Sequence, residues 1–311
     1  MISLIKNSKL SYAFFNLFNK EKLKHNIPLY KKYNIKKAYF SPISSNDFKK
    51  VEAQFPRREK SDSIPQTEFY KNQTPENQQS LSTFFDNGYS IVKNFISEDE
   101  ADQINSEIQK LLDNNEIHFK YGNKLMFALH KSEIIKKIGL EKSLLEFLDL
   151  LLDGKTKLFQ SINFINGSQQ KTHSDSIHMT TFPLGGLIGV WIALEDIKAD
   201  QGALHYYPGS HKLPYYMNSD YDNEGNFLML GKKGNKGYEN MLQDKVKELK
   251  IQKEVFECKK GDMLIWHANI LHGGEPHTNK DKTRKSMVFH FFDENSVCYH
   301  EITQRPALFE N

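Results

Sequence analysis

The sequence predicts a mainly β domain with flanking helices, of the α+β class, from three observations. Apolar tracts over residues 157–165 and 187–196 indicate strands, and the second tract is apolar enough for a buried strand. Two segments with helical spacing of apolar residues, near 97–112 and 143–152, come before these strands. Tight-turn sequences such as Pro208–His211 follow. Helices ahead of a set of strands fit a jelly roll with helices on one face.

The first 80 residues are predicted to be a basic extension and connector ahead of a main domain over residues 81–311. Residues 1–60 hold 14 Lys and Arg against 4 Asp and Glu, a balance of +10, and the remainder has a balance of −7. This asymmetry predicts either a surface for an anionic partner, such as a membrane or polyanion, or a solvated extension that packs on the acidic domain. A short amphipathic helix near residues 11–18 fits peripheral membrane contact or, as the preferred prediction, docking onto the protein body.

Further elements follow in chain order. Residues 51–79 are rich in Pro, Gln, Asn and Ser, and predict an extended connector. A strand is expected over residues 88–92, and the capping box formed by Ser97 and Glu100 starts the first helix. The polar, glycine-containing insertion over residues 213–249 is predicted to be a lid or substrate loop, because long insertions in compact domains are usually functional or disordered.

Several protein classes are not expected. No apolar run approaches the roughly 18 residues that a transmembrane helix needs, and the first 20 residues do not resemble a signal peptide. No aromatic-interleaved basic motif predicts a nucleic-acid partner. Cys258 and Cys298 lie far apart without metal-site spacing, which indicates reduced thiols in a cytoplasmic protein. No motif predicts the oligomeric state.

The strongest candidates for metal ligands are His173 and Asp175, together with the distant His272. A His-x-acid pair is expected by chance roughly 1.5 times in a chain of this composition, so the surrounding strands and turns carry the prediction. In an antiparallel strand His173 and Asp175 would project from one face and could share a metal ion. Two imidazoles and a carboxylate on one side of a metal are the ligand set of non-haem Fe(II) oxygenases, with the other side open.

The two histidines and Asp175 belong to a longer series of matching segments: Gly167–Gln170, His173–Asp175, Gly189–Asp196, Gly202–Leu204, Pro208–His211, Gly261–Asp262, His272 and Arg284. In these segments the chain resembles the phytanoyl-CoA dioxygenase family of Fe(II)- and 2-oxoglutarate-dependent oxygenases, over roughly residues 85–293. The resemblance implies a double-stranded β-helix (jelly-roll, cupin-like) core, with Fe(II), 2-oxoglutarate and O2 as cofactor and co-substrates.

The resemblance also implies roles for residues near 2-oxoglutarate. Arg284, twelve residues after His272, would bind the distal carboxylate through its planar guanidinium. Trp191, Gln170 and Lys124 are candidates for further contacts with the co-substrate. Many relatives carry a Ser two residues after the second His as a partner of the co-substrate carboxylate. This chain has Gly274 there, so that contact with the carboxylate is lost or supplied elsewhere.

The implied activity is hydroxylation of a small-molecule or lipid-like substrate with release of succinate and CO2. Related halogenases lack the metal-binding carboxylate, so Asp175 favours hydroxylation, with desaturation or ring formation as open outcomes. The alternatives are a cupin-like metal protein without oxygenase activity, or a membrane- or polyanion-binding module that acts through the basic N-terminus. The sequence does not identify the substrate.

The other histidines near the predicted strands have less support as ligands. His178, His205 and His211 are predicted to form structural hydrogen bonds. His267, five residues before His272, is the rival ligand, but Gly273 and Gly274 after His272 allow the close backbone approach of a ligand turn, which favours His272.

Overall fold

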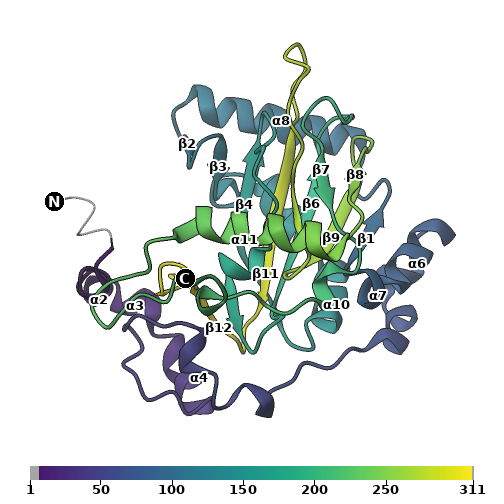
Figure 1. Ribbon diagram of the computed structural model, residues 1–311. Coiled ribbons are helices and arrows are strands. Elements are labelled where there is room, and N and C mark those ends of the chain that lie inside the picture. The colour runs from purple at the N-terminus through teal and green to yellow at the C-terminus, as the bar shows by residue number, and fades with distance from the viewer. Residues whose placement is uncertain (1–6, 310–311) are drawn as a thin grey trace.

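The computed structural model of the chain describes residues 7–309, in which the strands form three antiparallel sheets (Figure 1). Their strand orders are β1-β9-β6-β11-β4-β3-β2, β10-β7-β8 and β13-β12-β5. The first six residues of the predicted extension and the last two of the predicted main domain lie outside this part of the chain. The strands are β1 (Tyr89–Val92), β2 (Phe119–Lys120), β3 (Lys124–Met126), β4 (Thr156–Phe164), β5 (Thr180–Phe182), β6 (Leu187–Ala193), β7 (Leu204–Tyr206), β8 (Glu254–Phe256), β9 (Met263–His267), β10 (His272–Gly274), β11 (Ser286–Asp293), β12 (Val297–His300) and β13 (Arg305–Pro306).

The large sheet and the β10-β7-β8 sheet enclose an apolar core. Side chains alternate along each strand, so Trp191 of β6 and Val288 of β11 face inward, where they pack with Leu204, Tyr206 and Phe256 of the smaller sheet. This is the two-layer arrangement of a double-stranded β-helix, as the sequence predicts.

The outer face of the large sheet is covered by helices. Val190 on β6 and Phe289 on β11 point to this side and join a second core with residues such as Ile104 and Leu148 of the helices. The Ser97 capping box predicted from sequence is present at the start of the first helix of this layer. The layer comprises α8 (Glu98–Asp113), α9 (Glu133–Gly139) and α10 (Lys142–Leu151).

The N-terminal part of the chain is more helical than predicted. The prediction of an extended connector is wrong from residue 61 onward, because Ile64, Phe69 and Leu81 anchor short helices in the core under the large sheet. Tertiary burial therefore outweighs the polar composition of this segment. The helices of this region are α2 (Lys9–Phe18), α3 (Lys20–Leu23), α4 (Asn26–Lys32), α5 (Glu68–Lys71), α6 (Pro75–Ser82) and α7 (Phe84–Asn87), with 3-10 turns at Ser45–Asp47, Glu52–Gln54 and Ser61–Gln66.

The insertion over residues 213–249 is also more regular than a loop. Its second half is the helix α11 (Gly234–Leu249), which crosses in front of the sheets in Figure 1. Tyr238 and Leu242 of this helix are buried against Ile177 and Leu271, which lie beside the predicted metal ligands. The insertion is thus packed onto the body of the protein through one apolar side.

Candidate metal centre and its cavity

Two predicted ligands, His173 and His272, lie side by side because their backbones pair. The His173 amide donates to the His272 carbonyl at 2.9 Å, and the His272 amide donates to the His173 carbonyl at 2.8 Å. This isolated antiparallel bridge joins residues that are 99 positions apart in sequence (272 − 173). The two imidazole rings consequently lie with their centroids 4.5 Å apart.

Both histidines have the tautomer that a metal ligand needs. His173 Nδ1 lies 2.9 Å from the Lys171 carbonyl oxygen, and His272 Nδ1 lies 3.1 Å from the Ile270 carbonyl oxygen. A carbonyl only accepts hydrogen bonds, so each Nδ1 carries the proton and each Nε2 keeps its lone pair. Burial, together with the neighbouring His272, holds the pKa of His173 well below its ordinary value, so this imidazole stays neutral.

Asp175 reaches the same point from a different backbone structure than predicted. It starts a 3-10 turn (Asp175–Ile177), so it does not share one face of a strand with His173. Its position is instead fixed by its carboxylate partners. Trp266 Nε1 donates to Asp175 Oδ2 at 2.8 Å, and His290 Nε2 lies 3.3 Å from the same oxygen. The other oxygen, Oδ1, is left to face the two histidines.

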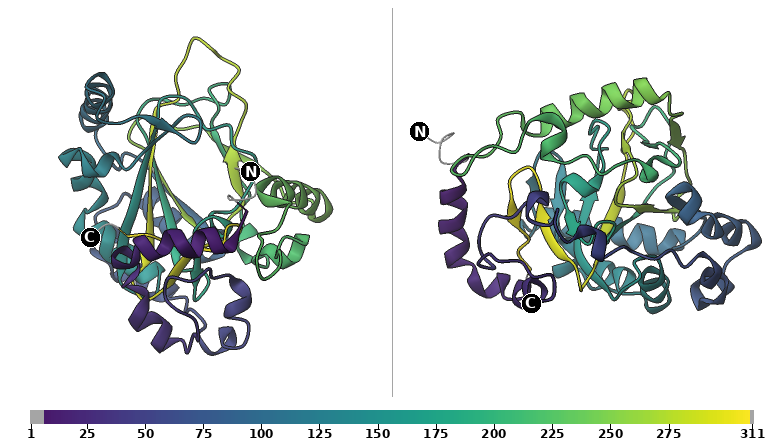
Figure 2. Two further views of the ribbon diagram at one scale, coloured as in Figure 1. Left: turned by 90° about the vertical axis from the view of Figure 1, so that its left-hand side faces the viewer. Right: turned by 60° about the horizontal axis from the view of Figure 1, so that its bottom comes forward.

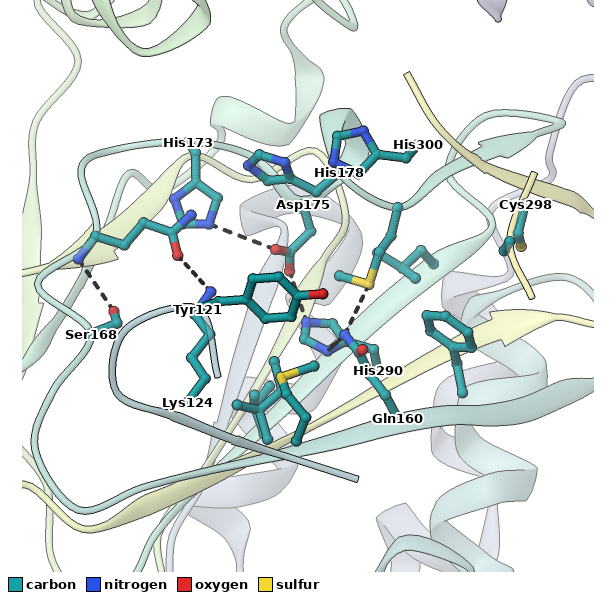
Figure 3. A pocket seen from close by; sticks show the side chains of 18 of the residues that line it. Tyr121, Lys124, Gln160, Ser168, His173, Asp175, His178, His290, Cys298 and His300 are labelled. Carbon is teal, nitrogen blue, oxygen red and sulfur yellow. Dashed lines mark hydrogen bonds and ion pairs between the residues drawn. The ribbon is translucent and has the colours of Figure 1, made fainter. Parts of the chain in front are cut away.

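The three side chains form a compact ligand set. Asp175 Oδ1 lies 3.8 Å from His173 Nε2 and 3.7 Å from His272 Nε2. One ion with bonds of about 2.1 Å can bridge atoms at such separations. Within residues 7–309, His173, Asp175 and His272 are the potential metal ligands that cluster, with their ligand atoms all within 4.8 Å of one another. Figure 3 shows His173 and Asp175 facing each other, with His290 behind the carboxylate.

The electrostatic surroundings of Asp175 favour its charged form. Burial by itself would raise the pKa of this carboxyl group, but His272 and the hydrogen bond from His290 hold the pKa well below its ordinary value. Gln160 Nε2 lies 3.1 Å from His290 Nδ1, so the amide donates to that nitrogen and leaves the Nε2 proton of His290 for Asp175. A chain of hydrogen bonds from β4 therefore orients the carboxylate.

Arg284 is a buried cation with unused hydrogen-bonding capacity. Its side chain is 3% exposed, its guanidinium carbon lies 4.9 Å from the Trp191 ring, and NH1 donates to Ser286 Oγ at 2.8 Å. Its Nε has no hydrogen-bond partner among the described residues. Burial lowers the pKa of Arg284 to about 10, so the group remains charged at neutral pH. Gly274 has no side chain, and Ser286 Oγ is the serine hydroxyl that the structure places beside Arg284.

The remaining predicted residues line the same cavity. Lys124 stands at the start of β3, and its ammonium group donates to Gln170 Oε1 at 3.1 Å. Burial lowers the pKa of Lys124. Trp191 is buried in the floor beside Arg284, and its Nε1 has no partner among residues 7–309. All seven predicted site residues thus border one cavity of about 780 Å³.

Sequence reasoning missed several side chains of this cavity. Trp266 and His290 hold Asp175, and a signal for His290 was available, because Arg284, Ser286, Val288 and His290 alternate on one side of the chain. Tyr238 of α11 does not line the cavity but was also missed: its hydroxyl lies 2.8 Å from the Oγ of Ser174, the residue between two predicted ligands. Further lining residues include Phe159, His178, Met179, Leu187, Phe292 and His300.

The other histidines are placed largely as expected. His205 bonds to Thr172 at 2.9 Å and lies 2.7 Å from Glu275, and His211 Nε2 donates to the Phe85 carbonyl at 3.0 Å. His267 Nδ1 accepts from the Asn269 amide at 3.1 Å and does not line the cavity, so it is not a rival ligand. His178 differs, because it borders the cavity with its ring 5.6 Å from that of His173.

Sequence comparison relates the chain to proteins of one kind. Phytanoyl-CoA dioxygenase domain-containing protein 1 of Danio rerio is 29% identical over 133 residues, which is 42% of this chain and 42% of that protein. The homologue in Dictyostelium discoideum is 22% identical over 276 residues and is matched over 93% of its length, with 71% of this chain covered. The chain therefore matches less than half of the first relative and nearly all of the second.

Solved structures with the same fold are more distant. The α-ketoglutarate-dependent carbocyclase SnoK from nogalamycin biosynthesis superposes with a TM-score of 0.62 at 15% identity, over 78% of this chain and 95% of that chain. The epimerase SnoN in complex with Fe3+, α-ketoglutarate and nogalamycin RO has a TM-score of 0.55 at 17% identity, over 71% and 84%. At these identities the likeness concerns the fold.

The three predicted metal ligands fall within one recognised domain. The model of the phytanoyl-CoA dioxygenase (PhyH) family matches residues 84–286, a span that includes the three predicted ligands, Trp191 and Arg284. Because this match covers more than half of the chain, the protein belongs to the phytanoyl-CoA dioxygenase family.

Proposed function

We propose that the protein is an Fe(II)- and 2-oxoglutarate-dependent oxygenase that hydroxylates a small-molecule or lipid-like substrate. The main support is one juxtaposition: three buried metal-ligand side chains and a buried, incompletely paired Arg284 border the same cavity. A buried guanidinium without a carboxylate partner is costly, and a dicarboxylate co-substrate would supply that partner. Family membership supports the same proposal.

In this proposal His173, Asp175 and His272 hold Fe(II), and each of the three supplies one ligand atom. Iron(II) with 2-oxoglutarate and O2 supplies an oxidative decarboxylation to succinate and CO2 that drives oxidation of a substrate C–H bond. Trp266 and His290 keep Asp175 Oδ2 occupied, which leaves Oδ1 for the ion. The protein thereby fixes one coordinating oxygen before any metal binds.

Arg284 binds the carboxylate of 2-oxoglutarate that does not contact the metal. Ser286 and the Trp191 ring limit the positions that the guanidinium can take. Lys124 and Gln170 are paired with each other on another wall of the cavity, where they can contact a polar group of the co-substrate or substrate. Apolar side chains such as Phe159 and Phe292 leave room for a hydrocarbon portion of the substrate.

The proposal is tested by anaerobic addition of Fe(II) and 2-oxoglutarate to the purified protein. A visible metal-to-ligand absorption band is expected in the wild type, and Arg284→Ala should weaken 2-oxoglutarate binding roughly tenfold or more, because a charge-assisted hydrogen-bonded pair is lost. Lys282→Ala is the matched control, since this nearby cation is exposed. A wild-type protein that binds Fe(II) without such a band would contradict the proposal.

The same titration separates the oxygenase from a cupin-like metal protein without oxygenase activity. A metal protein of that kind needs no buried cation beside its ligands. Its affinity for the metal would therefore be the same with and without 2-oxoglutarate, and the same in Arg284→Ala. The expected result is that 2-oxoglutarate tightens metal binding in the wild type and not in the variant.

Hydroxylation itself is tested by product mass. Proteins of this fold include the carbocyclase SnoK and the epimerase SnoN, so the fold leaves the outcome of C–H oxidation open. Incubation with a cell extract, 2-oxoglutarate and O2 should give a product that is heavier by one oxygen atom, together with succinate. A product of unchanged or reduced mass would contradict hydroxylation and indicate rearrangement, ring formation or desaturation.

The cytoplasmic location stays a prediction, consistent with the two free, buried cysteines.

A further inference from the structure

The helix α2 turns its apolar face away from the protein. Leu10, Phe14, Leu17 and Phe18 recur at helical spacing on one side, and all four are exposed, with Phe14 63% and Phe18 77% exposed. The inner side of the helix is held by a polar residue: Asn16 is buried and donates to the Phe40 carbonyl at 2.8 Å. This orientation is opposite to that of an ordinary surface helix, whose apolar side faces the protein.

A second apolar segment lies beside α2. The Lys9 amide donates to the Leu228 carbonyl at 2.8 Å, and Ser8 forms a bridge with Met229. This pairing places Phe227, 89% exposed, and Leu228, 47% exposed, next to the start of α2. Because exposed large apolar side chains gathered in one place mark interaction sites, the two segments form one candidate surface.

The surroundings of this surface are basic. Between residues 9 and 37 the chain has eight lysines and a single acidic residue, Glu21. Lys20 and Lys24 follow directly after the apolar face of α2 and are exposed, and Lys24 pairs with the exposed Glu21 at 2.7 Å. An exposed apolar helix face flanked by lysines is the composition of segments that lie in the interface of an anionic bilayer.

The surface also adjoins the mouth of the metal cavity. Phe15 and Asn16 of α2 line that cavity together with Arg305 and the metal ligands. Figure 2 (left) views the molecule from this side, with α2 in front of the sheets. Among residues 7–309 the structure contains no helix long and apolar enough to cross a membrane.

We propose that the docking surface, made of Leu10, Phe14, Leu17, Phe18, Phe227, Leu228 and the adjacent lysines, binds the surface of an anionic lipid bilayer. The aromatic side chains enter the interfacial region while the lysines contact acidic headgroups. A second copy of the chain fits less well, because a twofold contact would bring the same cluster of lysines on each protomer together. This inference concerns location and does not depend on the proposed oxygenase activity.

The test is sedimentation of the full-length protein with vesicles of phosphatidylcholine alone or mixed with phosphatidylserine. The wild type should bind the mixed vesicles more tightly, and added salt should weaken this binding. Phe14→Ser with Phe18→Ser should reduce binding by about tenfold or more, because two apolar side chains no longer enter the interface. Lys20→Glu with Lys24→Glu should reduce binding to the vesicles that contain phosphatidylserine and leave binding to pure phosphatidylcholine vesicles unchanged.

Matched controls lie on other exposed elements. Leu140→Ser removes an apolar side chain that is 45% exposed, and Lys136→Glu with Lys137→Glu reverses charges on α9. Both controls should bind vesicles like the wild type. Circular dichroism should be the same for all variants, since the altered side chains are exposed. The proposal is overturned if the wild type binds neither kind of vesicle. It is also overturned if the wild type does not bind vesicles but self-associates in solution, and Phe14→Ser with Phe18→Ser makes it monomeric.

Discussion

Trp266 Nε1 donates a 2.8 Å hydrogen bond to Asp175 Oδ2, and it thereby connects a strand of the large sheet to the carboxylate of the candidate metal centre. Without this donor only His290 Nε2, at 3.3 Å, would hold this oxygen of the carboxylate. The contact explains how a residue on a 3-10 turn can hold a defined orientation.

Replacing Trp266 by Phe should therefore weaken metal binding. Loss of an outer partner of a ligand typically costs 10- to 100-fold in metal affinity, and a fall of about this size is expected in an anaerobic Fe(II) titration. Trp191→Phe is the control for the loss of an indole N–H, because Trp191 Nε1 has no partner among the described residues. Equal metal affinities of the two variants would show that the Trp266 contact does not orient Asp175.

Gly189→Ala should disturb the same contact from the neighbouring strand. A Cβ atom at this position would lie 2.3 Å from Trp266 Cε2, which is too close unless the indole moves. Overpacking of this kind typically costs about 1–3 kcal/mol, and urea unfolding should show a loss in that range together with weaker Fe(II) binding. Unchanged stability would mean that the indole has room to move.

Metal and co-substrate should stabilise the fold together. The ligands come from segments 99 residues apart, so the unfolded chain offers no formed site, and ligand at 100 times its dissociation constant should add about 2.7 kcal/mol. Thermal melts with Mn(II) and 2-oxoglutarate should rise relative to melts in EDTA. Asp175→Ala should abolish the rise, whereas Asp196→Ala, which removes an exposed carboxylate, should keep it.

Tyr238→Phe tests the link between α11 and the metal-binding loop. The substitution removes the hydroxyl that contacts Ser174 and keeps the buried ring, so a loss of about 0.5–1.5 kcal/mol is expected in urea unfolding. The KM for the substrate should change more than the KM for 2-oxoglutarate, because Glu239 and Asn235 of the same helix line the cavity. Tyr221→Phe, which loses a hydrogen bond to Asn218, is the control within the insertion.

Two half-buried histidines that are not metal ligands, His267 and His300, predict the response of stability to acid. Burial lowers the pKa of His267 and of His300 from 6.5 to about 3, so both are neutral when folded. Below about pH 6.5 the unfolded chain binds protons that the folded chain does not, so stability is complete above this pH and falls as the pH drops toward 3. Urea midpoints in EDTA should decrease over this range. His267→Gln should show a shallower decrease, and an unaltered slope would contradict the assignment.

The grouping of the ligand triad and Arg284 around one cavity could be predicted from sequence because these residues and their flanking segments resemble a family pattern. Trp266 and His290 were not predicted, since their partnership with Asp175 depends on which strands are neighbours: β9 and β11 lie on either side of β6. The helix α11 was missed because it begins at Gly234 and contains Gly237, both weak helix formers, and is held by burial of Tyr238.

The alternation along β11 has a further consequence. Ser286, Val288 and His290 face the space between the large sheet and the β10-β7-β8 sheet, whereas Met287, Phe289 and Phe291 pack against the helical layer. A slip of this strand by a single position would exchange the two sets, burying an imidazole under the helices and pushing aromatic rings into the cavity. The register of β11 therefore sets both the position of the cavity residues and the packing of the helical layer. A shift in register would disrupt both together.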